Sequence, residues 1–123
     1  MIKQILLVGL GGGIGSIVRF LTSHLTAKIL SSHFPVATLL VNLLGCLLIG
    51  VLIGLSFKNQ WLDMNMRALL ITGFCGGFTT FSAFSLENVQ MYQAGNYTGL
   101  IFYTLASVII GFAAVWIGLT FTK

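Results

Sequence analysis

The stretch Cys75–Phe84, CGGFTTFSAF, lies at the centre of a long uncharged run and decides how the chain folds. The whole run, from Ala68 to Leu86, is long enough to cross a lipid bilayer as a helix. Its centre nevertheless combines two adjacent glycines with two threonines, and glycine in a helix interior costs roughly 1 kcal/mol relative to alanine. We therefore predict a break, with a new helix beginning near Thr79 or Thr80. In hydrocarbon such a break is tolerated only where the backbone lines a cavity or is buried in protein.

The composition is typical of an integral membrane protein. The chain has 123 residues, of which 57% are hydrophobic and 7% are charged, whereas soluble domains carry roughly 25% charged residues. The net charge of +4 comes from basic residues scattered singly along the chain, and nucleic-acid binding usually needs a clustered basic face. We therefore expect no nucleic-acid partner and place the positive charges at the edges of a lipid bilayer.

Four apolar segments have the length of a membrane-crossing helix. They run from about Ile5 to Leu25, from Val36 to Leu55, from Ala68 to about Val89 and from about Tyr97 to Phe121. Their connections are short, so neighbouring helices are antiparallel and both termini lie on one side. The first segment lacks a signal-peptide cleavage motif and is interpreted as a retained helix. The predicted fold class is all-α integral membrane, with one four-helix transmembrane domain over residues 1–123 and the third helix broken at its centre.

The basic residues divide unevenly between the two sides of the membrane. One side receives Lys3, Lys58, Arg67 and Lys123, whereas the other receives Lys28, with Arg19 as a further candidate. The positive-inside rule then favours cytoplasmic termini. The difference in positive charge between the two sides is small enough to be compatible with insertion of the chain in both directions.

Small residues recur at a spacing of four, which lets helices approach closely in lipid. The pairs are Gly11 with Gly15, Gly50 with Gly54, and Gly73 with Gly77. Helix packing is the leading interpretation of the first two pairs. The cysteines, Cys46 and Cys75, show no metal-ligand spacing and are interpreted as packing residues.

Several polar and aromatic residues within the spans allow a structural or an ion-binding interpretation. Asn42 either joins two helices or offers an N–H donor to an anion. Phe81 and Phe84, at i and i+3, either pack in the core or aim their positive ring edges at one anion. Tyr103 and Ser107 share a face of the fourth segment, and each hydroxyl donates either to an anion or to a carbonyl one turn back.

The charged residues nearest the membrane interior are few. Arg19 either extends its charge to the interface or draws anions into a vestibule, and Glu87 either pairs with a base or lines an entrance. The sequence presents no nucleophile–base pair and no metal-ligand cluster, so we do not expect an enzyme.

Three motifs resemble those of the Fluc fluoride channel family, also called CrcB, and the match covers nearly the whole chain. They are GGGIGSIVR from Gly11 to Arg19, TLLVNLLG from Thr38 to Gly45, and GFCGGFTTFSAFSLE from Gly73 to Glu87. The third motif is the most specific. The pattern of Tyr103, Ser107 and Gly111 is weaker support.

The resemblance implies a passive, fluoride-selective channel that exports fluoride from the cytoplasm of a bacterium across its plasma (inner) membrane. It also implies an antiparallel, dual-topology homodimer, although some members pair non-identical subunits and a heterodimer stays open. A structural sodium ion would lie at the dimer centre, bound by backbone carbonyls of Gly76 and Thr79. Fluoride would meet residues from three helices, which by resemblance are Asn42, Phe81, Phe84, Ser82, Thr80, Tyr103 and Ser107. Arg19 and Glu87 would lie toward the pore ends.

Two positions depart from the family pattern, and two other functions remain as alternatives. Ala83 stands where the family commonly has threonine, so one hydroxyl of the polar track is missing, and Ala37 replaces the usual glycine. One alternative is a small multidrug-type proton-coupled antiporter, which needs a carboxylate in its first helix that this chain lacks. The other is a non-transporting membrane assembly protein, for which the glycine pairs suffice.

Overall fold

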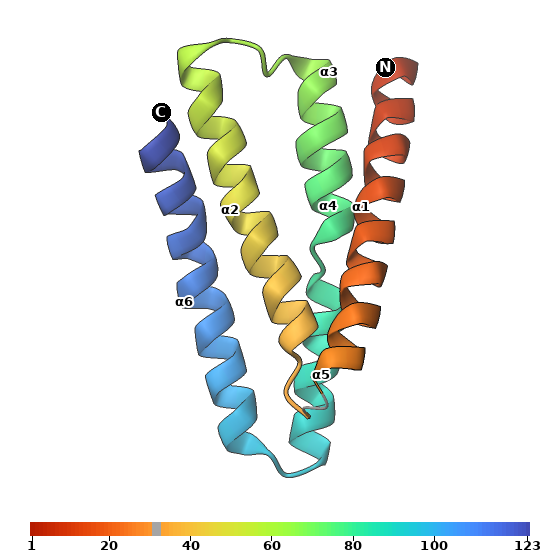
Figure 1. Cartoon of the computed structure of the whole chain (residues 1–123), viewed down its shortest axis with the longest axis vertical. Coiled ribbons are helices and arrows are strands. Elements are labelled where there is room, and N and C mark those ends of the chain that lie inside the picture. The colour runs from red at the N-terminus through yellow and green to blue at the C-terminus, as the bar shows by residue number, and fades with distance from the viewer. Residues whose placement is uncertain (31–32) are drawn as a thin grey trace.

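Four long helical spans, joined by short connections, form the part of the chain that the computed structural model describes, residues 1–30 and 33–123 (Figure 1). The first, second and fourth spans are α1 (Ile2–Ile29), α2 (Val36–Lys58) and α6 (Tyr97–Thr122). The third span comprises α3 (Met64–Met66), the π-helical segment η1 (Arg67–Cys75), α4 (Gly76–Phe78) and α5 (Phe81–Gln93). All four spans are long and apolar enough to cross a membrane, which confirms the four predicted segments. Both termini lie at the same end (Figure 1).

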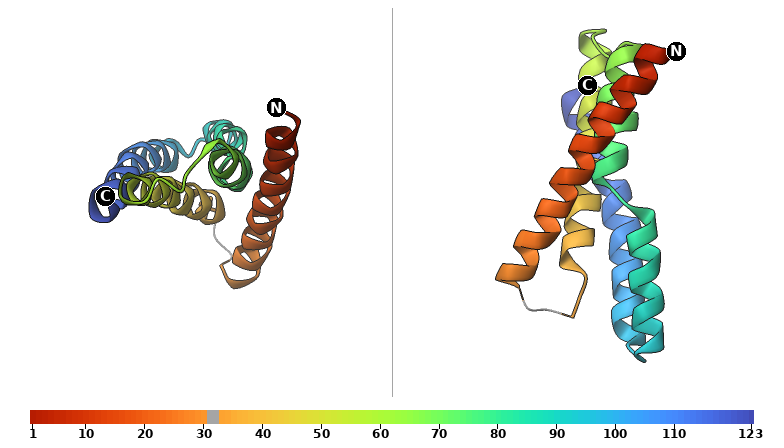
Figure 2. Two further views of the ribbon diagram at one scale, coloured as in Figure 1. Left: turned by 90° about the horizontal axis from the view of Figure 1, so that it is seen from above. Right: turned by 90° about the vertical axis from the view of Figure 1, so that its right-hand side faces the viewer.

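The spans associate mainly in two pairs. Helix α2 packs along α6, and α1 packs against η1 and α4 of the third span. Figure 2 shows α1 crossing the third span at an angle and diverging from α5. Since few large side chains are fully buried and most large apolar ones are exposed, the outer surface is suited to lipid.

Glycines permit the close approach within both pairs of helices, as their spacing predicted. A Cβ atom on Gly15 of α1 would collide with the backbone oxygen of Phe74 and lie 2.8 Å from the nitrogen of Phe78. In the other pair, a Cβ atom on Gly50 would collide with the carbonyl oxygen of Val115 and lie 3.0 Å from the nitrogen of Leu119. The helix backbones therefore touch directly, which is the packing mode expected without a hydrophobic driving force in lipid.

The π-helical segment of the third span was not predicted from the sequence. Its hydrogen bonds close over five residues instead of four, a geometry that is rare and often found near functional sites. Gly73 suits this turn, because a Cβ atom there would lie 2.9 Å from the carbonyl oxygen of Ala68, five residues earlier. The glycine predicted to serve helix packing thus also accommodates the widened turn.

The predicted break is confirmed at Thr79 and Thr80, whereas the two glycines that were expected to share in causing it remain helical. Both threonines are extended, with φ −91° and ψ 160° at Thr79 and φ −152° and ψ 122° at Thr80. Gly76 keeps helical angles of φ −63° and ψ −37°. Gly77 also lies within α4, where its missing side chain leaves room for the backbone of Gly12. The glycines therefore serve helix contact, whereas the threonines interrupt the helix.

Candidate functional site

A cavity of about 390 Å³ lies where α2, the break, α5 and α6 meet. Its lining includes several of the residues predicted to face an ion, namely Asn42, Thr80, Phe81, Phe84 and Ser107. Two other candidates lie next to these residues. The Ser82 hydroxyl is 3.1 Å from that of Thr80, and the Tyr103 ring lies 4.9 Å from the Phe84 ring, centroid to centroid. The structure therefore brings Asn42 together with residues that lie 38 to 65 positions later in the chain, because the spans are antiparallel.

Asn42 is bonded to the backbone at the break by both ends of its amide. Its Nδ2 donates to the carbonyl oxygen of Thr80 at 3.0 Å, and its Oδ1 accepts from the Thr80 backbone nitrogen at 2.8 Å. An amide nitrogen carries two N–H donors, so one N–H of Asn42 has no acceptor among the described residues. Asn42 thus fixes the extended backbone and retains a donor on the cavity side.

These bonds divert donors from two carbonyl groups of the third span. In a continuous helix the nitrogen of residue i donates to the carbonyl of residue i−4, which would pair Thr80 with Gly76 and Ala83 with Thr79. Instead, the Thr80 nitrogen donates to Asn42, and the Ala83 nitrogen donates to the Thr80 hydroxyl at 3.1 Å. The carbonyls of Gly76 and Thr79 therefore lose their regular helical donors. They are the two carbonyls that the family resemblance assigned to a cation.

Arg19 lies at the break. Its Nε donates to the carbonyl oxygen of Gly77 at 3.0 Å, and the hydroxyl of Ser16 donates to the same oxygen at 3.4 Å. Gly12, Ser16 and Arg19 follow each other at helical spacing on the face of α1 that meets the third span. That spacing is the signal from which this contact could have been predicted. Ser16 was not among the predicted site residues.

Phe81 and Phe84 are adjacent on α5, with ring centroids 5.8 Å apart and ring planes inclined by 42°. Phe84 also packs on the buried Tyr103 ring, whereas Phe81 is 78% exposed. Gly76 and Ser82 are exposed beside the break as well. Backbone and hydroxyl groups at the centre of a membrane span thus lie on an outer surface of the single chain.

Among the residues that the structure describes, Glu87 is held by two hydroxyl groups and by no base. The Tyr103 hydroxyl donates to Glu87 Oε1 at 2.8 Å, and the Thr38 hydroxyl donates to Oε2 at 2.7 Å. Tyr103 is fully buried and Thr38 is 7% exposed. Thr38 begins one of the three family motifs but was not predicted as a site residue. Its position one turn before Asn42 on α2 was the available signal.

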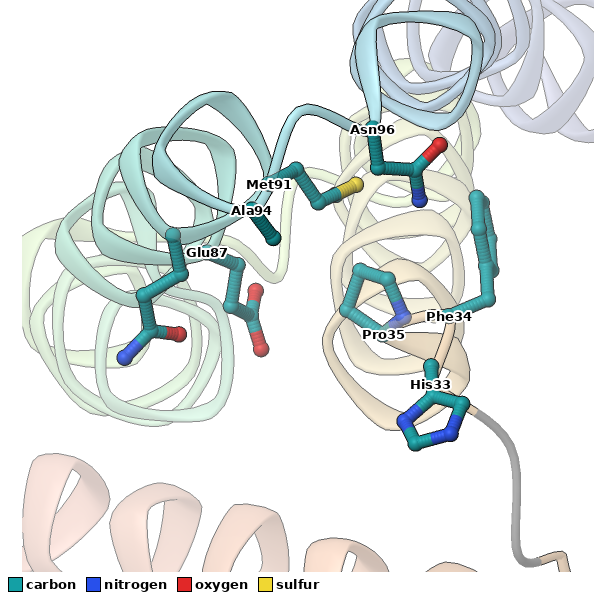
Figure 3. Close-up of a pocket in the computed structure, with 8 residues that line it drawn as sticks. His33, Phe34, Pro35, Glu87, Met91, Ala94 and Asn96 are labelled. Atoms are coloured by element: carbon teal, nitrogen blue, oxygen red, sulfur yellow. The ribbon is translucent and has the colours of Figure 1, made fainter.

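A second cavity, of about 570 Å³, lies at the end of the molecule that holds the α5–α6 connection. Glu87 forms part of its wall together with His33, Phe34, Pro35, Gln90, Met91, Ala94 and Asn96. Figure 3 shows the Glu87 carboxylate directed into the space between α5 and the start of α2. Glu87 therefore connects the buried hydroxyl groups to a cavity near the membrane edge.

Ser107 contributes a hydroxyl to the smaller cavity that is not otherwise used. Its Oγ is buried and has no hydrogen-bond partner among the described residues. Because buried hydroxyl groups are normally hydrogen-bonded, Ser107 is suited to bind a group that enters the cavity.

Comparison with known proteins gives a consistent result over the whole chain. Residues 6–119 match the family described as CrcB-like protein, Camphor Resistance (CrcB). A protein of Azobacteroides pseudotrichonymphae genomovar. CFP2 is 58% identical over 123 residues, covering 100% of this chain and 98% of the relative. Proteins of Flavobacterium psychrophilum and Pseudomonas putida are 43% and 44% identical, each covering at least 98% of both chains. All three relatives are named fluoride-specific ion channel FluC.

Proposed function

The chain belongs to the CrcB family of multi-pass membrane proteins, and from this premise we propose that it is a passive fluoride-selective channel that removes fluoride from a bacterial cytoplasm. The observation that carries the proposal is the full-length 58% identity to a relative named as a fluoride-specific channel. The curated relatives are named as channels, which confirms the expectation that the chain is not an enzyme.

The working channel is proposed to be two copies of the chain, inserted antiparallel to each other. Exposed polar groups at mid-span are costly in lipid unless another protein surface covers them. The backbone of Gly76 and the hydroxyl of Ser82 are such groups at exposed positions beside the break. A second copy would cover them, and inverted insertion agrees with the weak asymmetry of positive charge between the two ends.

The smaller cavity is proposed to be part of the fluoride path. A selective site must replace the water around a small, tightly hydrated anion with well-placed donors. The second N–H of Asn42 and the unpartnered hydroxyl of Ser107 offer two donors, and the edges of Phe81 and Phe84 offer positive partial charge. No lysine or arginine lines this cavity within the described part of the chain. An anion would therefore be attracted without being held by a fixed cation.

Other hydroxyl groups are proposed to extend the path toward the membrane edge. Thr80 caps the start of α5, Ser82 lies in the first turn of α5, and Tyr103 contacts both Phe84 and Glu87. Glu87 would stand at the end of this track, where the larger cavity begins. We also propose that Arg19 attracts anions toward this path from beside the break, where its Nε is anchored on the Gly77 carbonyl, and not from a pore end.

A structural sodium ion is proposed at the break, with the carbonyl oxygens of Gly76 and Thr79 as ligands. Unwound backbone carbonyls commonly coordinate sodium in membrane proteins. These two carbonyls fit that role because their helical donors are bonded to Asn42 and to the Thr80 hydroxyl. A second copy would contribute the same two oxygens. The ion would supply positive charge that offsets the carbonyl dipoles, and Asn42 would keep the break open.

The proposal is tested by fluoride release from liposomes that contain this chain alone. A passive channel releases fluoride down its gradient when potassium ionophore balances the charge, and it does so without a proton gradient. Release that requires a proton gradient would favour the antiporter alternative. Absence of release from folded protein would favour a heterodimer or a non-transporting protein.

A further inference from the structure

Four basic residues lie at one end of the molecule. Lys3 begins α1, Lys58 ends α2, Arg67 begins η1 and Lys123 follows α6. Figure 1 shows these helix ends gathered at the end that holds both termini. All four residues are exposed. We call this set of four residues the terminal face.

Contacts between helix ends arrange the four residues as two pairs. The Gln4 side chain donates to Asn65 at 3.1 Å, so α1 and α3 touch close in sequence to Lys3 and Arg67. In the other pair, the Lys123 backbone nitrogen lies 3.1 Å from the position of a Cβ atom on Gly54. Gly54 is one helical turn before Lys58. The two cations of each pair therefore come from helices that touch near them.

The chain offers these cations no carboxylate partner among the residues that the structure describes. The sequence contains two acidic residues, Asp63 and Glu87. Asp63 is exposed near these residues and keeps its charge, while its Oδ1 accepts from the Met66 backbone nitrogen at 2.9 Å as a helix cap. Glu87 is bonded to Thr38 and Tyr103 in the other half of the third span. The four cations of the terminal face therefore outnumber the one acidic side chain near them.

The positions of these residues suit the depth of lipid headgroups. Lys3, Lys58 and Arg67 lie at the ends of apolar spans, and Lys123 directly follows the fourth span. Phe57 is 65% exposed beside Lys58, and Met64 is 74% exposed near Arg67. Trp61 lies in the connection between them, and tryptophan is enriched at membrane interfaces. The molecules that present negative charge at this depth are anionic phospholipids.

We propose that the terminal face is a binding site for the phosphate headgroup of anionic phospholipids, with one phosphate near each basic pair. Arginine and lysine both donate to phosphate oxygens, and arginine can do so with two parallel bonds. At the opposite end of the molecule, Lys28 in the last turn of α1 is the corresponding cation. In an antiparallel pair of chains, each leaflet would meet one terminal face, so both leaflets would supply bound lipid. Lipid binding itself requires neither conduction nor pairing.

The test measures lipid binding to the purified full chain in neutral detergent by native mass spectrometry. Phosphatidylglycerol is the probe, with phosphatidylcholine and inorganic phosphate as comparisons. We expect phosphatidylglycerol to bind in preference to both. The double variant Lys58→Gln/Lys123→Gln should bind it about 25-fold more weakly, from about fivefold for each cation removed at an anionic surface. Lys28→Gln is the matched control and should bind as the unaltered chain does.

Three outcomes would overturn the proposal: equal binding of phosphatidylcholine, equal binding of inorganic phosphate, or an equal loss in Lys28→Gln. Lys58→Arg/Lys123→Arg keeps the charge and should keep the binding. If the glutamine variant does not fold, a salt titration of the unaltered chain replaces it. Phosphatidylglycerol binding should then weaken as salt screens the headgroup, and binding that does not respond to salt would contradict the proposal. Fluoride release in neutral lipid should be unchanged by the glutamine substitutions, so this test can fail independently of the proposed channel function.

Discussion

Replacing Asn42 with alanine removes both hydrogen bonds that hold the extended backbone at Thr80. These bonds measure 3.0 and 2.8 Å and join α2 to the break. Interhelical hydrogen bonds in membranes average about 0.6 kcal/mol, with values up to about 1.7 kcal/mol. Losing two of them should lower the free energy of unfolding by about 1 to 3 kcal/mol. The Thr80 nitrogen would also become available to the carbonyl of Gly76, which would close the break toward a continuous helix.

The assay pairs unfolding in mixed detergent with fluoride release from liposomes, and Asn88→Ala serves as the matched control. Asn88 is also an amide with two bonds, donating to the Phe84 carbonyl at 3.0 Å and accepting from Thr104 at 3.1 Å. Asn88 does not line the smaller cavity. We expect similar losses of stability in the two variants, but loss of fluoride release only in Asn42→Ala. Equal loss of release in both, or normal release in Asn42→Ala, would refute the role of Asn42 at the break.

Three other substitutions test separate parts of the structure. Gly15→Val should unfold the chain or separate α1 from the third span, at a cost of about 3 kcal/mol or more, because a Cβ atom there meets the facing backbone. Gly13→Ala has nothing within 4 Å of its Cβ position and should unfold at the same or a higher denaturant concentration, because alanine favours a helix more than glycine does. Phe84→Ile should keep the size-exclusion profile of the unaltered chain yet lose most fluoride release. The control Phe121→Ile, on the exposed end of α6, should lose none. Unchanged release in Phe84→Ile would show that the Phe84 ring takes no part in the mechanism. Ala83→Thr should raise the rate of fluoride release by adding a hydroxyl beside Ser82, and a lower rate would contradict the polar track at this position.

Hydropathy predicted the four spans because a span of suitable length needs only an apolar composition. It could not predict the π-helical segment, since closing a turn over four or five residues leaves the composition unchanged. That geometry depends on how Gly73 meets Ala68 within the same span. The break was predictable because Thr79 and Thr80 follow two poor helix formers. The structure corrected the cause, since Gly76 itself remains helical.

The site was predictable as a set of residues, but its bonds were not. For Asn42 the sequence left two interpretations. In the structure both ends of its amide are bonded to the backbone of Thr80, and one of its two N–H donors has no acceptor among the described residues. For Arg19 and Glu87 the partners depend on how α1 and α2 pack against the third span, which no local pattern specifies. Tertiary packing produces the contact of Arg19 with Gly77 and the contacts of Glu87 with Thr38 and Tyr103. Resemblance supplied the identity of the ions, which remains a proposal.

The central claim is that this chain alone forms a passive pathway that selects fluoride over chloride. The most direct measurement is the initial rate of release of each halide from liposomes that contain only the purified chain, with matched gradients and potassium ionophore. The account predicts rapid fluoride release and chloride release no faster than from protein-free liposomes. Equal release of the two halides would contradict selectivity, and release of neither by folded protein would contradict the claim that this chain suffices.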